Sequence, residues 1–119
     1  MQNPEKVIAN IVKIAKEGIE DKKGNNILTL RFDPDQSSIC DFFIICDVES
    51  DRQAKAISNY LEKKIKDELK LKPASIEGFE TAQWILLDYF DVIIHIFQKE
   101  YRDFYSLEKL WADAEIIRN

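Results

Sequence analysis

Three side chains in the C-terminal half, those of Asp88, Asp91 and His95, are of the types that bind metals or transfer protons, and His95 is the only histidine of the chain. They lie in the segment LLDYFDVIIHIF, residues 86–97, whose apolar runs predict two strands joined by a turn. About 13 Å separates Asp91 from His95 on such a strand, because residues on one face are about 7 Å apart. These two side chains therefore cannot ligate one metal ion or share one proton.

The predicted hairpin has two unlike faces. With a turn at Tyr89 and Phe90, Trp84 lies opposite His95. One face is wholly apolar, so we expect it to lie beneath helices. The other face combines aromatic residues with an acidic edge, which is typical of a binding surface rather than a catalytic centre. This second face contains Trp84, Leu86, Asp88, Asp91, Ile93, His95 and Phe97.

Other signatures of catalysis are missing from the sequence. Its three glycines are scattered, so there is no phosphate-binding loop and no dinucleotide fingerprint, and no serine lies in a nucleophile elbow. A strand would place Cys40 and Cys46 about 20 Å apart, too far for a disulfide, so we expect buried thiols. The motif DPD, residues 33–35, is interpreted as a turn. We expect no catalytic residue, no metal ion and no cofactor.

Length and composition predict one domain covering residues 1–119. The chain is 45% hydrophobic and 11% aromatic, so it can bury a core. A formal net charge of −5 disfavours direct binding to nucleic acid and favours a basic protein partner. The first residues lack the apolar core of a signal peptide, and no apolar run is long enough to span a bilayer. We therefore expect a cytoplasmic protein with no membrane partner.

Periodicity and capping signals predict the order α-β-β-α-β-β-β-α. Asn3 as N-cap and Pro4 at the first helical position predict a helix that ends at Gly24. Ser50 and Gln53 form a capping box at the start of a second helix. The order predicts an α/β (α+β) fold in which a mixed sheet carries its helices mainly on one face. About five strands are expected, at residues 27–32, 39–46, around 76, 84–88 and 92–97, and the tail from residue 99 is expected to be helical.

The segment from Glu77 to Ala114 resembles the ribosomal silencing factor, or Iojap, family. Its pattern is a Glu-Gly pair, a tryptophan before a strand, an aspartate-flanked turn, a histidine-bearing strand and a Tyr-x-Leu-Glu-x-Leu-Trp-x-Asp-Ala motif. Upstream, residues 37–57, SSICDFFIICDVESDRQAKAI, resemble the other signature of the family. The C-terminal pattern is carried by Glu77, Gly78, Trp84, Asp88, Asp91, His95, Arg102, Tyr105, Leu107, Glu108, Leu110, Trp111, Asp113 and Ala114.

The resemblance implies a nucleotidyltransferase-like fold that lacks the catalytic residues of that superfamily. It also implies binding to uL14, the fourteenth protein of the large ribosomal subunit, at the face where the small subunit docks. Such a factor sterically blocks joining of the two subunits and represses translation under nutrient limitation. Two alternatives stay open, a large-subunit assembly factor and a nucleotidyltransferase on the same fold. Related proteins are often dimers, which leaves a homodimer of the free protein open as well.

The aromatic face and the resemblance together indicate which residues would contact a ribosomal protein. Trp84 is central, with the alternative that it is a core residue covered by Tyr105 and Trp111. The candidate partner-binding residues are Glu77, Trp84, Asp88, Asp91, His95, Phe97, Arg102 and Tyr105.

The chain departs from the family pattern in two places. Asp47, Val48 and Glu49 stand where the family commonly has a small, glycine-containing link. Phe90 stands in the hairpin turn, where glycine is common. Because a bulky residue resists positive φ, we expect a wider or bulged turn at this position.

Overall fold

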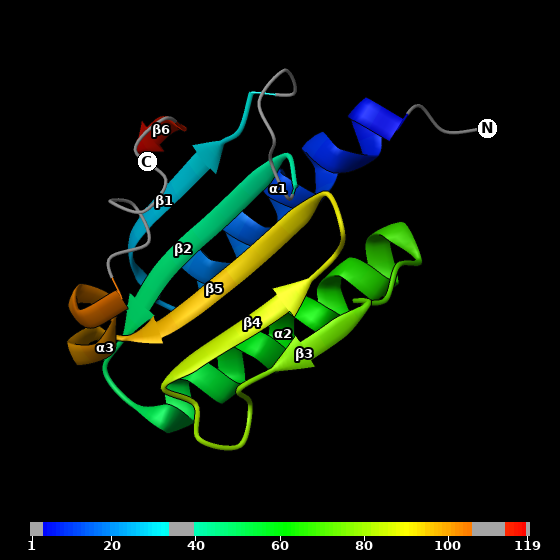
Figure 1. Ribbon diagram of the computed structural model, residues 1–119. Coiled ribbons are helices and arrows are strands. Elements are labelled where there is room, and N and C mark those ends of the chain that lie inside the picture. Colours follow the sequence, from blue (N-terminus) through cyan, green and yellow to red (C-terminus); the bar gives the residue numbers. More distant parts are fainter. Residues whose placement is uncertain (1–3, 34–39, 106–113, 119) are drawn as a thin grey trace.

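The computed structural model describes residues 4–33, 40–105 and 114–118, without the side chains of residues 103–105 and 118. A mixed six-stranded sheet carries two long helices on one face and a short helix on the other (Figure 1). The elements are α1 (Pro4–Asp21), β1 (Asn25–Arg31), β2 (Phe42–Val48), α2 (Asp51–Leu69), β3 (Ser75–Glu77), β4 (Trp84–Asp88), β5 (Val92–Gln98), α3 (Lys99–Tyr105) and β6 (Glu115–Arg118).

The sheet has the strand order β3-β4-β5-β2-β1-β6, with one parallel pair, β2 and β5, at its centre. In that pair Ile44 lies beside Ile94, and every other neighbouring pair is antiparallel. Parallel strands need a long crossover, and α2 lies within the connection between β2 and β5. The expected mixed sheet, with α1 and α2 on one face, is confirmed.

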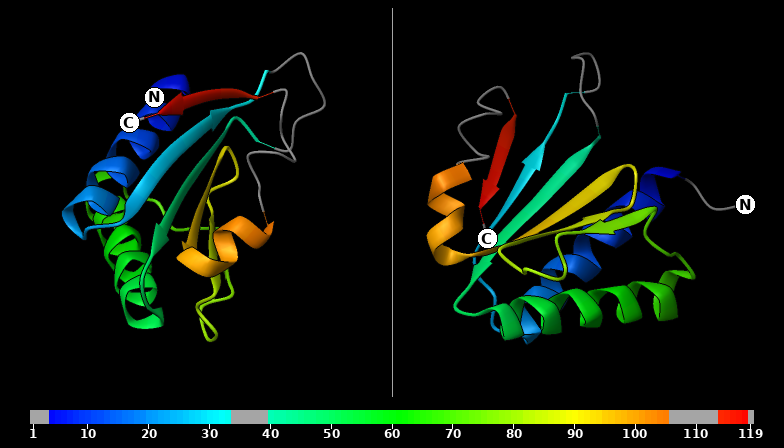
Figure 2. Two further views of the ribbon diagram at one scale, coloured as in Figure 1. Left: turned by 90° about the vertical axis from the view of Figure 1, so that its left-hand side faces the viewer. Right: turned by 60° about the horizontal axis from the view of Figure 1, so that its bottom comes forward.

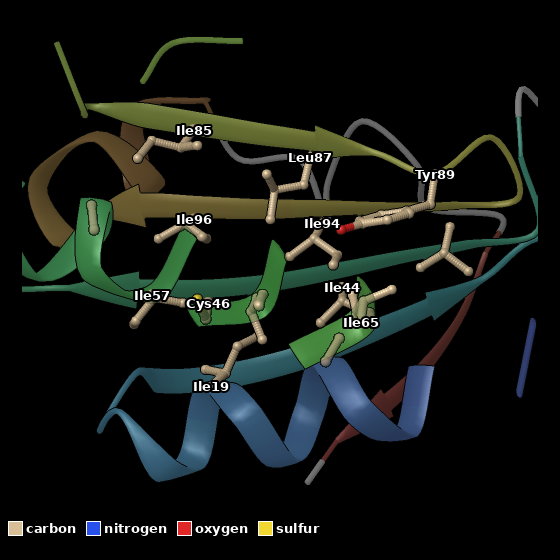
Figure 3. Packing of buried hydrophobic residues seen from close by; sticks show 14 of the residues in the cluster. Ile19, Ile44, Cys46, Ile57, Ile65, Ile85, Leu87, Tyr89, Ile94 and Ile96 are labelled. Atoms are coloured by element: carbon tan, nitrogen blue, oxygen red, sulfur yellow. The ribbon is translucent and has the colours of Figure 1, made fainter. Parts of the chain in front are cut away.

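Helices α1 and α2 pack side by side on this face, while α3 lies on the opposite face (Figure 2). The stripe of apolar residues along α1 faces the sheet, as its helical spacing predicts. Close packing of the two helices depends on Gly18, where a Cβ atom would lie 2.5 Å from Leu61 Cδ2. Figure 3 shows the resulting core, in which helix residues such as Ile19, Ile57 and Ile65 meet the side chains of the sheet. The strand residues labelled there are Ile44, Cys46, Ile85, Leu87, Ile94 and Ile96.

The end of α1 differs in detail from the prediction that Gly24 terminates the helix. Pro4 is the first described helical residue, whereas Asn3 lies outside the described residues. Lys23, not Gly24, adopts the left-handed conformation, with φ of 62°. Its N–H donates to Glu20 at 3.0 Å and the Gly24 N–H donates to Ile19 at 2.9 Å, which is the bond pattern of a Schellman motif.

The predicted capping box is present at the start of α2 and also ties the two helices together. Ser50 Oγ accepts from the Gln53 N–H at 3.1 Å. The Gln53 amide oxygen accepts from the Glu49 N–H at 3.1 Å, one residue earlier than the box requires. Gln53 Nε2 donates to the carbonyl of Lys23 at 3.0 Å. One glutamine therefore joins the N-terminus of α2 to the C-terminus of α1.

The tail is not helical throughout, which corrects the predicted order of elements. Residues 115–118 form β6, an antiparallel edge strand on β1 in which Ile116 pairs with Leu30. Two adjacent isoleucines favour a strand when a partner edge is available, and β1 offers one. The sheet therefore has six strands instead of about five.

The β4–β5 turn also differs from the prediction, because the register is displaced by two residues. Trp84 pairs with Phe97 rather than with His95, which pairs with Leu86. The turn is tight and not widened, since Phe90 adopts a positive φ of 68°. The burial of Tyr89 on the helix-covered face explains the shift, because this side chain extends β4 by one more residue. A displacement of two residues leaves every side chain on its predicted face.

A buried ion pair attaches α3 to the sheet. Arg102 Nη1 of α3 donates to Asp47 Oδ2 of β2 at 3.0 Å, and their side chains are only 8% and 4% exposed. Arg102 also donates to the backbone carbonyl of Asn26, and Asn26 Nδ2 donates to Asp47 Oδ2 at 3.1 Å. Asn26 lies where the β1–β2 register shifts and has a φ of 51°. One cluster of polar groups therefore joins α3, β2 and β1.

Removal of this guanidinium is predicted to destabilise the fold strongly. Arg102→Met should lower the free energy of unfolding by about 3–5 kcal/mol, because it leaves a buried carboxylate without its cation. The matched control is Arg31→Met, which breaks the ion pair with Glu115 at 3.4 Å, where both side chains are more than half exposed. This control should cost about 1 kcal/mol or less. Urea unfolding measures both values, and equal losses would contradict a structural role for the buried pair.

Candidate partner-binding surface

The side chains singled out in the sequence meet on the sheet face that α1 and α2 leave uncovered, here called the open face. Glu77 of β3 pairs with Leu86 of β4, and Leu86 pairs with His95 of β5, so these residues share one face. Trp84 and Phe97 form the next pair along the same face. The predicted division of the hairpin into an apolar and an aromatic face is thus confirmed.

A row of rings crosses the open face from β4 to Phe32, the residue that follows β1. Trp84 stacks on Phe97 with ring centroids 5.0 Å apart. His95 packs edge-to-face against Phe43 of β2 at 4.5 Å, and Phe43 packs against Phe32 at 4.8 Å. Such geometries add stabilisation beyond the burial of area. This row is the centre of a second apolar core, composed of Leu30, Phe32, Cys40, Phe43, Ile45, Ile93 and Phe97.

His95 is a packed strand histidine, as the sequence predicted, and its bond with Trp84 determines which ring nitrogen carries the proton. Trp84 Nε1 donates to His95 Nδ1 at 3.0 Å, so the neutral ring carries its proton on Nε2. His95 is 2% exposed, and burial lowers its pKa to about 3. Within the described part of the chain, Nε2 has no hydrogen-bond partner. With its only acceptor atom occupied, this imidazole cannot serve as a general base.

Trp84 combines features of both alternatives considered for it. The ring is partly buried, it stacks on Phe97 and it satisfies His95, all of which are structural functions. The remaining part of the ring is accessible on the open face. Trp111, the residue proposed to cover it, lies outside the described residues, as does the side chain of Tyr105.

The aspartates of the hairpin hold its turn and edge the open face. Asp88 Oδ1 accepts from the Phe90 N–H at 2.8 Å. The Asp91 carbonyl accepts from the N–H groups of Asp41 and Phe42, at 2.9 and 3.0 Å, which joins the turn to β2. The Asp91 side chain is exposed, whereas that of Asp88 is partly buried.

The structure separates the eight candidate residues into groups. Glu77 and Asp91 are exposed, and Trp84 and Asp88 are partly so, whereas Phe97 is buried. Arg102 faces inward to Asp47, so it positions α3. The sequence singled out Phe90 only for the geometry of the turn, and the structure shows this residue 72% exposed there. The sequence did contain an indication of this exposure, because a phenylalanine stands at a turn position where positive φ favours glycine.

Within the described ranges, no group of three or more histidine, cysteine, aspartate and glutamate side chains is arranged to hold a metal ion. Cys40 and Cys46 are free and buried, as predicted. Their burial raises both pKa values to about 12, so the thiols are poor nucleophiles. No helix in the described part of the chain has the length and apolarity needed to cross a membrane.

Comparison with known proteins identifies the family of the chain. The profile of the family described as "Ribosomal silencing factor during starvation" matches residues 4–119, nearly the whole chain. The chain belongs to the ribosomal silencing factor family. It is 39% identical over 107 residues to the ribosomal silencing factor RsfS of Bacillus subtilis, with 90% of this chain and 89% of the relative covered. The RsfS of Halalkalibacterium halodurans is 38% identical, with 90% of each chain covered.

This member of the ribosomal silencing factor family is also similar to a solved structure and to a mitochondrial protein. The crystal structure of protein CV0518 from Chromobacterium violaceum is 34% identical, has a TM-score of 0.82 and covers 88% of this chain and 86% of its own. A mouse protein named "Mitochondrial assembly of ribosomal large subunit protein 1" is 35% identical over 82 residues, which are 66% of this chain and 36% of the mouse protein. The solved structure therefore shares the mixed α/β fold of this chain, and the likeness to nucleotidyltransferases stays a prediction.

The buried imidazole predicts a pH dependence of stability. Burial lowers the pKa of His95 from 6.5 to about 3 in the folded state. Between these values the unfolded chain binds a proton that the folded chain does not, so stability falls as the pH drops below 6.5. At about pH 5 the loss from this one group is about 2 kcal/mol, since each pH unit costs about 1.4 kcal/mol.

The matched variant is His95→Asn, whose amide oxygen can still accept from Trp84 but which does not titrate. Urea unfolding near neutral pH and at about pH 5 gives the loss for each protein. Carboxylates contribute equally to the loss of stability in both proteins, so the difference between the two losses measures the contribution of His95. We expect the variant to lose about 2 kcal/mol less than the parent. Equal losses would show that the imidazole is protonated in the folded state.

Proposed function

We propose that this protein is a ribosomal silencing factor that binds uL14 of the large subunit and sterically blocks joining of the small subunit. In this way it represses translation in the cytoplasm when nutrients are limiting. The observation that supports the proposal most is the family match over residues 4–119. A family whose description names silencing of ribosomes during starvation makes translation the process on which this chain acts.

The chemistry of the open face suits a ribosomal protein as partner. Ribosomal proteins are basic, and this chain carries a formal net charge of −5. Trp84 is a partly exposed aromatic residue on this face, Glu77 provides an exposed carboxylate on the neighbouring strand, and Asp91 provides another at the turn, the far end of the hairpin from Trp84. Buried aromatic centres with polar rims are where interface energy concentrates. We therefore propose these residues and Asp88 as the contact set, supported from beneath by His95 and Phe97, with Arg102 and Tyr105 acting through α3.

The proposal assigns no catalysis to this chain. His95 has no free acceptor atom, and the two thiols are buried. Nucleotide transfer needs carboxylates clustered around metal ions that bridge the phosphates. Incorporation of a labelled nucleotide into an acceptor by the purified protein would contradict this part of the proposal.

A second candidate function is assembly of the large subunit. It is favoured by the mouse relative, whose name assigns it to assembly of the mitochondrial large subunit. The same contact with uL14 would serve both functions. The two differ in timing, because a silencing factor acts on mature subunits and an assembly factor acts on their precursors. A homodimer of the free protein, formed through the open face, is compatible with either function.

The direct test is sucrose-gradient sedimentation of purified, mature ribosomal subunits with and without the protein. We expect the protein to sediment with large subunits and to reduce the yield of joined ribosomes, because it occupies the face on which the small subunit docks. Unchanged joining at saturating protein, with binding to large subunits retained, would favour the assembly function. Sedimentation with small subunits alone would contradict both.

A pair of charge reversals tests the surface in the same assay. Glu77→Lys places a positive charge on the open face, and Glu17→Lys makes the same change on the exposed side of α1. A like charge facing a basic partner should weaken binding to large subunits roughly tenfold for the first variant. The second variant should bind like the parent. Equal effects of the two would show that net charge, and not the open face, controls binding.

A further inference from the structure

Phe90, at the tip of the β4–β5 turn, is the most exposed large hydrophobic residue among the described ones, at 72%. It also has a φ of 68°, in the left-handed region that phenylalanine rarely adopts. Glycine would adopt this conformation freely. The fold therefore tolerates backbone strain in order to present an aromatic ring to solvent, and strain of this kind concentrates at ligand contacts.

The turn is held rigidly in place from both sides. Asp88 Oδ1 accepts from the Phe90 N–H at 2.8 Å, and the Asp91 N–H donates to the Tyr89 carbonyl at 2.9 Å. Tyr89 is buried beneath α2 and its N–H donates to the Val92 carbonyl at 2.9 Å. Because Tyr89 is fixed toward the helices, Phe90 cannot turn its ring into the core. The backbone that carries the exposed ring is thus held in place before binding, which reduces the entropy lost on binding.

Three aspartates lie at the end of the sheet that carries Phe90. Asp88 and Asp91 flank this residue in the chain, and the Asp41 N–H donates to the Asp91 carbonyl at 2.9 Å, which brings a third aspartate to the same end of the sheet. Burial is the main cause that raises the pKa of the neighbouring Cys40 thiol, and all three carboxylates add to it. This end of the sheet therefore has a negative potential around an accessible aromatic face.

The exposed ring and the nearby carboxylates determine which chemical group can bind at this turn. A second copy of the chain would bring three further carboxylates to the same place, and an anionic membrane surface would also be repelled. A guanidinium group satisfies both components, because it stacks on aromatic rings and pairs with carboxylates. A basic protein surface presents such groups.

We propose that Phe90, together with the carboxylates of Asp41 and Asp91, forms a receptor for an arginine side chain of the basic ribosomal partner. This inference rests on the proposed function and adds a contact that sets specificity. Asp88 is the positioning residue, since it holds the Phe90 N–H. The site lies at the rim of the open face, next to the acidic edge that β4 and β5 supply.

Three substitutions at position 90 distinguish the contributions of the aromatic ring, of apolar bulk and of backbone strain. Phe90→Gly removes the ring and relieves the strain, so its melting temperature should rise by roughly 5 °C while its affinity falls roughly tenfold or more. Phe90→Leu keeps apolar bulk without a π-face and should also bind several-fold more weakly. Phe90→Tyr keeps the ring and should bind within about twofold of the parent. The matched control is Ile116→Ser, which removes an exposed apolar side chain, 41% accessible, at the opposite edge of the sheet.

Binding is measured with purified large subunits and with purified uL14, and the oligomeric state is followed by analytical ultracentrifugation. Parent-like binding by Phe90→Gly would overturn the inference alone and leave the proposed function intact. Parent-like binding by Phe90→Leu would overturn the guanidinium assignment in favour of an apolar pocket. Loss of self-association instead of ribosomal binding would overturn the choice of partner. Absence of binding by the parent protein would overturn the proposed function together with the inference.

Discussion

Strand β5 lies between β4 and β2, and its side chains from Val92 to Phe97 are buried on both faces. Other side chains must therefore cover the centre of the sheet on both of its faces. On one face α1 and α2 bury an aliphatic core (Figure 3). On the other face the described residues include one short helix, α3, which the buried pair of Arg102 and Asp47 anchors. Aromatic rings from β4, β5 and β2, together with the ring of Phe32, cover one another there. This unequal covering leaves β3 and β4 accessible at one side of the open face.

The same constraint determines what the polar residues of the hairpin can do. His95 lies on the doubly covered strand, so burial keeps it neutral and its Nδ1 is paired with Trp84. Trp84 lies one strand further out, so it can satisfy His95 on one side and remain accessible on the other. A side chain that is both anchored and partly exposed needs little reorganisation on binding. Asp88, Asp91 and His95 are residue types that can bind metals or transfer protons, but here they have other functions. His95 packs in the core, Asp88 and Asp91 form the turn, and both aspartates contribute negative charge.

Local patterns in the sequence were sufficient for most of the fold, because helix stripes, capping residues and strand alternation are properties of neighbouring residues. The face of each hairpin residue was predictable even though its register was not, since alternation has a period of two. The features that could not be predicted depend on distant contacts. Tyr89 shifts the turn because it packs into the core beneath the helices. Residues 115–118 become a strand because they pair with the edge of β1, and Arg102 turns inward because it binds Asp47, 55 residues earlier in the chain.

The proposed function requires that the open face, and not the helix layer, contacts the ribosome. Site-specific photo-crosslinking to purified large subunits tests it most directly, with the crosslinking amino acid placed at Glu77 on β3 or at Lys66 on the exposed side of α2. We expect a crosslink to uL14 from position 77 and none from position 66. A crosslink to ribosomal protein from position 66 alone would place the helices at the interface and contradict the account.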